Sequence, residues 1–246
     1  RKLLLDKGLL VRQLKWTSPK GRKMKLKLTR CVSMERQHIA VISCNVSELE
    51  GVESLRIVSG CNTEVISHQT DKSDPRTGAG FLHSPLECIE KKIELDRAII
   101  IQETRNSKLK FAEVISNSHC AGLDALMPEL KDDGIDFHYE GQPKVGPDCY
   151  TLEKFICFHE TEELALKEIN HAEQTGVNVI FREQEDNVKK FWSLADIQIR
   201  SNTLETADAL SLQQGIRFNL FSIYQSAGRD GKRNIAAKGL SGEGYE

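Results

Sequence analysis

The sequence predicts a chain that is mainly β over its first 160 residues and helical after them. Short runs of Val, Ile, Leu and Phe, several alternating with polar residues, are separated by turn-forming segments such as Ser18-Pro19-Lys20-Gly21 and Gly141-Gln142-Pro143. From Thr161 onward the apolar residues recur at intervals of three and four instead. Because no helical pattern interrupts the strands, an antiparallel sandwich is favoured over a parallel α/β sheet.

Composition places the chain among globular proteins. It has 246 residues, with 34 basic and 36 acidic side chains, a formal charge of −2, and 39% hydrophobic residues. This balance excludes a disordered chain and a collagen. No apolar run reaches the roughly 18 residues that span a bilayer, and no secretion signal is visible. We therefore expect no membrane partner and a cytoplasmic location.

The strand pattern recurs in several segments of the first 160 residues. The stretch 71–95 has no clear period, and we expect a long connection or an irregular strand there. The segments predicted as strands are Leu9–Trp16, Arg22–Val32, Gln37–Val46, Ser54–Val58, Arg97–Thr104, Lys110–Ile115, Gly134–Tyr139 and Thr151–Phe158.

Three helices are predicted in the remainder. Thr161, followed by acidic residues, has the pattern of a helix start, and this first helix should end near Gly176. A second helix is expected over about Val179–Leu194. A third follows Asn202-Thr203 and runs to Ala227-Gly228.

The third helix is expected to be apolar on more than one side. One stripe follows helical spacing, whereas Phe218, Phe221 and Tyr224 lie off it. Such a helix requires partners on two sides, so we expect the chain to be part of a longer protein. The stripe consists of Ala209, Leu212, Ile216, Leu220, Ile223 and Ala227.

The first thirty residues are strongly basic, with eleven Lys or Arg against one acid, Asp6. Clustered cations can bind nucleic acid. The alternative is a solvated strand face, and in the segment Lys23–Leu28 lysines do alternate with apolar residues. No aromatic residues interleave with those lysines to stack on bases. We favour the strand face and expect no nucleic-acid partner.

Cysteine and histidine patterns do not indicate a metal centre. The seven cysteines are an odd number at irregular spacing without C-x-x-C, and we expect neither a disulfide nor a bound metal. The segment His159–Glu163 lacks the second histidine, four residues on, that a zinc protease helix requires.

A glycine-rich loop near the end of the chain is the strongest candidate for a function. Gly239, Gly242 and Gly244 allow close backbone approach, while Lys238 and Glu243 bring opposite charges to the same loop. The order of glycines does not match a dinucleotide-binding fingerprint. From the residues alone, a functional loop and a plain connection remain equally open.

Two segments near the end resemble motifs of glycoside hydrolase family 65, the family of the maltose, trehalose, kojibiose and nigerose phosphorylases. The segment Gln213–Phe221 is similar to the family's Q-x-x-R-F-N-x-F, and Ala237–Tyr245 to A-K-G-L-[ST]-G-E-G-Y. Trp192, Ser193, Asp196 and Ile197 also resemble a family segment just upstream.

The resemblance implies an architecture. It implies an N-terminal antiparallel β super-sandwich over residues 1–160 and a helical linker over 161–203. It also implies a helix and loop over 204–246 that lead into an (α/α)6 catalytic barrel. The reaction it implies is inverting phosphorolysis, in which an α-glucosidic disaccharide and inorganic phosphate give β-glucose 1-phosphate. Phosphate would be a co-substrate, no cofactor is implied, and the whole protein is expected to be a homodimer.

The resemblance assigns no catalytic residue to this chain, because the family's general acid lies beyond its end. The chain alone is therefore expected to be inactive. Two alternatives remain open, namely a trehalase-like hydrolase of the same family and a non-catalytic carbohydrate-binding module. The residues expected on the substrate side of the active-site entrance are Lys238, Gly239, Gly242, Glu243, Gly244 and Tyr245.

Overall fold

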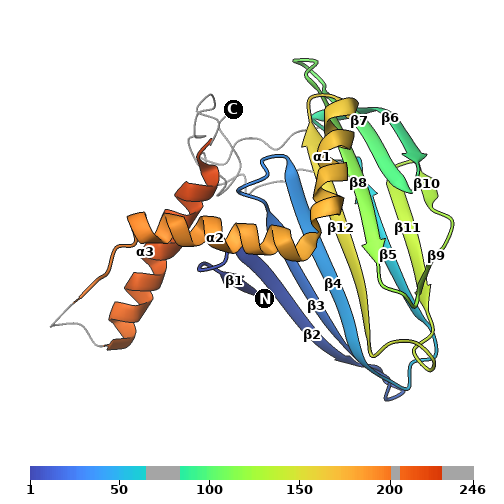
Figure 1. The fold of residues 1–246 in the computed structure, drawn as a ribbon, viewed down its shortest axis with the longest axis horizontal. Coiled ribbons are helices and arrows are strands. Elements are labelled where there is room, and N and C mark those ends of the chain that lie inside the picture. Colours follow the sequence, from blue (N-terminus) through green and yellow to red (C-terminus); the bar gives the residue numbers. More distant parts are fainter. Residues whose placement is uncertain (65–83, 201–205, 229–246) are drawn as a thin grey trace, which may run out of the picture.

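The computed structural model describes residues 1–64, 84–200 and 206–228 (Figure 1). Its largest part is an eight-stranded antiparallel sheet with the strand order β1-β2-β3-β4-β12-β8-β7-β6. These strands are β1 (Lys2–Leu4), β2 (Leu9–Thr17), β3 (Lys23–Val32), β4 (Ile39–Glu50), β6 (Leu86–Glu94), β7 (Arg97–Thr104), β8 (Lys110–His119) and β12 (Cys149–His159).

A smaller antiparallel sheet packs against one face of the large one. In it, β11 pairs with β5, β9 and β10, and the core between the two sheets is apolar. Ile100, Ile115, Ile135 and Tyr150 are among its fully buried side chains. The strands of the small sheet are β5 (Leu55–Asn62), β9 (Leu123–Ala125), β10 (Glu129–Lys131) and β11 (Gly134–Gly141).

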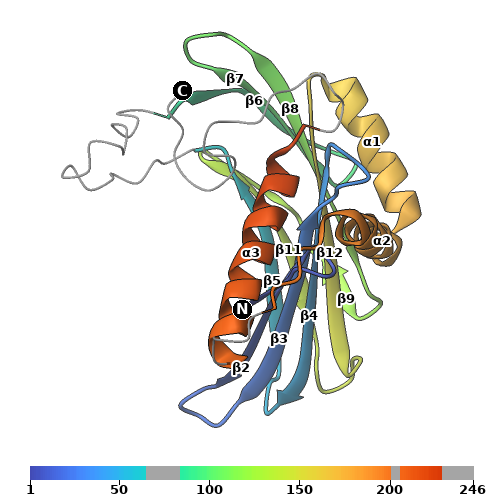
Figure 2. The same cartoon turned by 90° about the vertical axis from the view of Figure 1, so that its left-hand side faces the viewer.

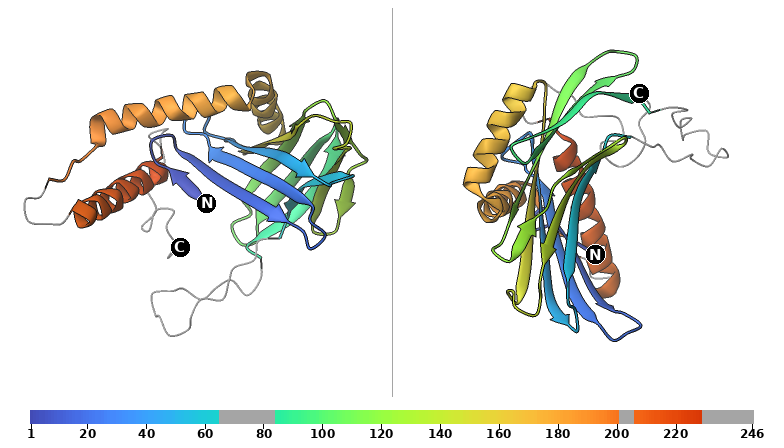
Figure 3. Two further views of the ribbon diagram at one scale, coloured as in Figure 1. Left: turned by 90° about the horizontal axis from the view of Figure 1, so that it is seen from below. Right: turned by 90° about the vertical axis from the view of Figure 1, so that its right-hand side faces the viewer.

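Two helices cover the opposite face of the large sheet, as Figure 3 shows. Helix α1 (Glu162–Thr175) and the first turns of α2 (Val177–Ala195) bury Ile169 and Ile180 against Val41, Val114 and Phe155 of the sheet. The central strands are therefore covered on both faces, which explains why β7 carries the continuous buried run Ala98–Ile100.

The three predicted helices are present, and the predicted ends of the first, at Thr161 and Gly176, are confirmed. The hydroxyl of Thr161 accepts a hydrogen bond from the backbone N–H of Leu164, and so caps α1. Gly176 separates α1 from α2 at φ +79°, a backbone conformation that favours glycine. The third helix, α3 (Thr206–Ser226), crosses α2 in Figure 1 and lies beside the N-terminal strands in Figure 2.

The eight predicted strands are present. Strand β6 lies in the stretch 71–95, where a long connection or an irregular strand was expected, and it is an irregular strand whose pairing with β7 shifts register between Cys88 and Glu90. The three other strands were not predicted. Strands β1, β9 and β10 have three residues each, too few for a pattern. Within the described residues, no helix combines the length and the apolar character needed to cross a membrane.

The apolar stripe predicted on α3 is only partly buried. Its members Leu212 and Ile223 are 48% and 59% exposed, and its other four members are half-buried. Of the two phenylalanines that lie off the stripe, Phe218 is 51% exposed and Phe221 is fully buried. The helix docks through a different face, formed by Gln213, Arg217, Phe221 and Tyr224. The reason is that its partners here are α2 and the segment after it, which offer polar as well as apolar contacts.

Candidate functional site at the junction of the last two helices

The predicted loop residues Lys238, Gly239, Gly242, Glu243, Gly244 and Tyr245 lie outside the described residues. The other motif residues, Trp192, Asp196, Ile197, Gln213 and Arg217, are described. They come together where α2 ends and α3 passes it, and they define the candidate site.

An ion pair between Asp196 and Arg217 holds this junction. Asp196 ends α2, where its backbone N–H donates to the Trp192 carbonyl. The guanidinium of Arg217 donates from Nε to Oδ1 at 2.8 Å and from a terminal nitrogen to Oδ2 at 2.7 Å. This bidentate geometry makes the arginine–carboxylate ion pair stronger than one with a single hydrogen bond. The guanidinium lowers the pKa of Asp196 below its ordinary value.

Gln213 ties the segment after α2 to α3. Its amide nitrogen donates to the Ile197 carbonyl at 2.7 Å, and its amide oxygen accepts from the Ile199 N–H at 2.8 Å. One side chain thus satisfies two backbone groups of a non-helical segment, which would otherwise need other partners. Together with Arg217, one helical turn further on, it fixes the path of the chain between the helices.

Aromatic packing completes the junction from the side of α2. The Trp192 indole N–H donates to the Leu5 carbonyl at 2.7 Å. The rings of Phe191 and Tyr224 stack with centroids 4.1 Å apart, and Phe221 is buried against Met34. These contacts join α2, α3 and the N-terminal strands into one small core.

An open pocket of about 800 Å³ lies at this junction. Asp196 cannot serve there as a proton donor near neutral pH, because Arg217 stabilises its ionised form. The described motif residues therefore position helices rather than transfer protons. The pocket is lined by Leu5, Asp6, Lys189, Trp192, Asp196, Leu210, Gln213, Gln214 and Arg217.

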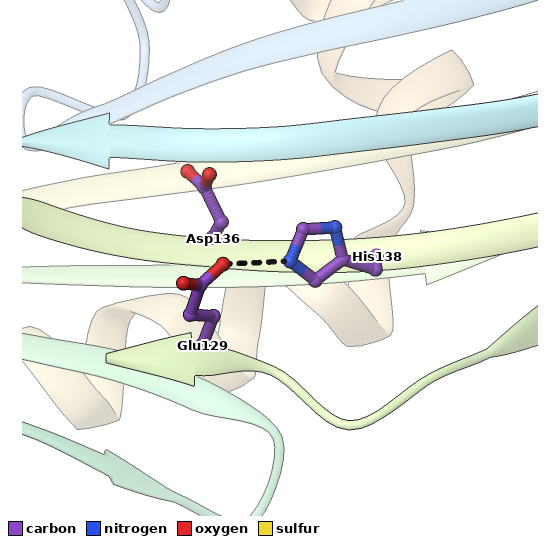
Figure 4. Close-up of side chains that lie close together, drawn as sticks. All are labelled: Glu129, Asp136 and His138. Atoms are coloured by element: carbon purple, nitrogen blue, oxygen red, sulfur yellow. Dashed lines mark ion pairs between the residues drawn. The ribbon is translucent and has the colours of Figure 1, made fainter. Parts of the chain in front are cut away.

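A second cluster, formed by Glu129, Asp136 and His138 on the small sheet, has the residue types of a metal site (Figure 4). Glu129 pairs with His138 at 3.5 Å, Arg56 lies 3.2 Å from the other ring nitrogen of that histidine, and Lys131 pairs with Asp136. Two cations thus already contact the groups that would bind a metal. We therefore interpret this cluster as an ion-pair network and not as a metal site.

Part of the basic N-terminal segment forms ion pairs with a neighbouring strand. Lys23 and Lys25 of β3 contact Glu50 and Glu48 of the neighbouring strand at 2.7 and 2.8 Å. On the opposite side of β3, Leu26 packs against the core between the sheets. The alternating pattern is therefore confirmed as a strand with one solvated face.

Comparison with known proteins identifies the family. The model of the glycosyl hydrolase family 65 N-terminal domain matches residues 1–192, which include both sheets, α1 and most of α2. The α,α-trehalose phosphorylase of Thermoanaerobacter brockii is 37% identical over the whole chain. That of Geobacillus stearothermophilus is 33% identical over the whole chain. The chain spans only 32% and 31% of the lengths of these two relatives.

A solved structure described as a kojibiose phosphorylase from the human microbiome has the same fold. It superposes with a TM-score of 0.77 at 18% identity, covering 98% of this chain and 30% of that one. The family model matches most of the chain, and the chain belongs to glycosyl hydrolase family 65, whose N-terminal domain it contains.

Proposed function

We propose that the chain is the N-terminal part of a disaccharide phosphorylase, an enzyme that cleaves an α-glucosidic disaccharide with inorganic phosphate. The products would be β-glucose 1-phosphate and the released sugar, with inversion at the anomeric carbon. The observation that carries this proposal is the identity of 37% and 33%, along the full chain, to two proteins named trehalose phosphorylases. Trehalose is accordingly the proposed substrate.

The chain's own part in this activity would be structural. We propose that residues 1–160 support the catalytic domain, that 161–203 link the two, and that 204–246 lead into the barrel. The Asp196–Arg217 pair and Gln213 then set the direction in which α3 leaves the sandwich. The exposed apolar face of α3 would pack against the barrel helices.

Two further features belong to the same proposal. The loop carrying Lys238, Gly239, Gly242, Glu243, Gly244 and Tyr245 would form part of the substrate side of the active-site entrance. The whole protein would act as a homodimer, with inorganic phosphate as its co-substrate and without a cofactor.

The test is an assay of the full-length protein with trehalose, maltose, kojibiose and nigerose, each with and without phosphate. We expect glucose 1-phosphate from trehalose only when phosphate is present. Release of free glucose at the same rate without phosphate would instead make the protein a hydrolase. Turnover of another of the four sugars in preference to trehalose would reject the proposed substrate.

A further inference from the structure

A groove lies on the large sheet beside α2, away from the junction described above. In Figure 1, α2 crosses the sheet and strands β2, β3, β4 and β12 continue past it. Under the helices, adjacent positions on three strands are apolar, namely Cys31, Val41 and Phe155. The next row on the same face is polar, namely Thr29, Ser43 and Glu153.

A third row continues the change from apolar to polar. Lys27 pairs with Asn45, and Asn45 pairs with Thr151, on the same face of the sheet. Together with side chains of α2 these rows enclose a groove of about 600 Å³, within the range of small-molecule sites. Its floor is thus formed by hydroxyl, amide and charged groups from three neighbouring strands.

The hydroxyl groups on the floor of this groove are little used by the fold. Thr29 and Ser43 are each only 8% exposed. Over the ranges 1–64, 84–200 and 206–228, the Thr29 hydroxyl has no hydrogen-bond partner. The Ser43 hydroxyl accepts from the Asn45 amide at 3.1 Å but donates to no group in those ranges. Both hydroxyls open onto the groove, so their unused hydrogen-bonding capacity is available to a ligand.

Several charged groups of the groove could also bind a ligand, because they have no partner among the described residues. In the part of the chain that the structure describes, Glu153, Lys27 and Arg182 form no ion pair and no side-chain hydrogen bond. The remaining ion pair at the groove joins Lys7 to Glu185 at 3.0 Å. Burial raises the pKa of Glu153 above its ordinary value, since no cation is close enough to offset it. The α2 wall adds the amide of Asn178 and the ring of Phe181.

The carboxylate, cationic and hydroxyl groups of the groove together indicate which class of ligand it can bind. A phosphate or another anion would meet the carboxylates of Glu153 and Glu185 as well as the cations, which disfavours it. A neutral polyhydroxylated molecule can donate to the carboxylate and accept from the ammonium, guanidinium and hydroxyl groups at the same time. We propose that this groove binds a saccharide, at a site in the N-terminal domain separate from the catalytic centre. The site goes beyond the proposed phosphorolysis and does not depend on it.

The proposal is tested by titrating the ¹⁵N-labelled 246-residue chain with trehalose, maltose and, separately, inorganic phosphate. With a saccharide, we expect saturable amide shifts confined to the groove strands around Thr29, Ser43 and Glu153. Shifts at the groove with phosphate but not with either sugar would overturn the proposal, as would the absence of any saturable shift there.

Two substitutions separate ligand binding from folding. Thr29→Val keeps the shape of the side chain and removes the unpartnered hydroxyl, so we expect about fivefold weaker binding and no loss of stability. Glu153→Gln should weaken binding about tenfold, because a charged acceptor is lost. Glu48→Gln, on β4 but outside the groove, is the matched control and should bind like the wild type.

Wild-type affinity in both Thr29→Val and Glu153→Gln would show that the groove is only a solvated sheet face. The measurement needs no turnover by the enzyme. Absence of phosphorolysis by the full-length protein would therefore not change the binding result. Absence of saccharide binding in the groove would likewise not reject the proposed phosphorolysis.

Discussion

Gln184 is the side chain on which three distant parts of the chain meet. It is 1% exposed on α2, its oxygen accepts from the Met34 N–H at 2.8 Å, and its nitrogen donates to the Gly8 carbonyl at 3.3 Å. Gly8 has φ +65°, and a Cβ there would come within 2.6 Å of the Gln184 amide. The turn before β2 and the end of β3 are thereby held on α2.

Replacing Gln184 by Ala should lower the free energy of unfolding by about 2–3 kcal/mol, because two buried backbone groups lose their partner and a cavity remains. Urea denaturation followed by circular dichroism measures the change. Gln225→Ala, at an exposed position of α3, is the control and should have little effect. A loss in Gln184→Ala no larger than in this control would show that the amide does not hold the three segments together.

The pair between Asp196 and Arg217 predicts a pH effect. Since the guanidinium lowers the pKa of Asp196, the stabilising interaction is complete above the ordinary aspartate pKa and is lost as the pH falls through the lowered value. In Arg217→Ala the pKa of Asp196 should rise toward its ordinary value. Carbon-13 NMR titration of the Asp196 carboxyl in both proteins measures this shift, and equal pKa values would contradict the geometry.

For individual residues, the sequence predicts some members of the candidate site but not their roles. Trp192, Asp196, Gln213 and Arg217 belong to segments that resemble family motifs, yet their spacing does not reveal that Arg217 reaches back 21 positions to Asp196. Thr29, Ser43 and Glu153 were not predicted as a group. Each lies two positions from a buried apolar residue on its strand, but only the register of β3, β4 and β12 places them side by side.

Helix α1 shows how an element is specified by its ends. The Thr161 hydroxyl caps its first turn, Glu162 and Glu163 suit the positive end of the helix dipole, and Gly176 ends it. The buried face, Ala165, Ile169 and Ala172, lies directly on the large sheet. Because these features are local in sequence, the helix could be predicted within one or two residues.

Thr161→Ala should lower the free energy of unfolding by about 1 kcal/mol, since the N–H of Leu164 loses its acceptor. Thr161→Ser retains an oxygen at that position and should remain close to the wild type. Thermal unfolding of the three proteins tests this. If both variants are equally destabilised, the effect does not arise from the cap.

Elements without a regular pattern of their own were harder to predict. Strand β6 carries its extra residue, Ile89, where its pairing with β7 shifts register, and this breaks the alternation that identifies a strand. Strands β9 and β10 exist only because β11 pairs with them. The docking face of α3 was not predicted, because hydrophobic spacing cannot show that polar side chains of this helix bind the segment after α2.

On the scale of the whole molecule, the large sheet is the central layer. The small sheet covers one of its faces, α1 and α2 cover part of the other, and α3 projects beyond them with apolar residues exposed. Exposed apolar patches of this kind mark surfaces that bind another part of the protein or another chain.

Replacing Phe218 and Ile223 together by Ser should lower the binding of a hydrophobic dye to this chain and leave its unfolding midpoint nearly unchanged, because both side chains are more than half exposed. Phe221→Ser, at the buried position one turn away, should be strongly destabilising. A large loss of stability in the double variant would mean that this face packs within the chain.

The central claim is that the chain supports catalysis without performing it. Inverting cleavage requires a carboxylic acid on one side of the scissile bond and a positioned nucleophile on the other, and at the candidate site Arg217 keeps Asp196 ionised. The most direct measurement is glucose 1-phosphate formation by the purified 246-residue chain, with the full-length protein as the positive control, across the four disaccharides with phosphate. We predict product from the full-length protein and none from the chain. Turnover by the chain alone would contradict the account.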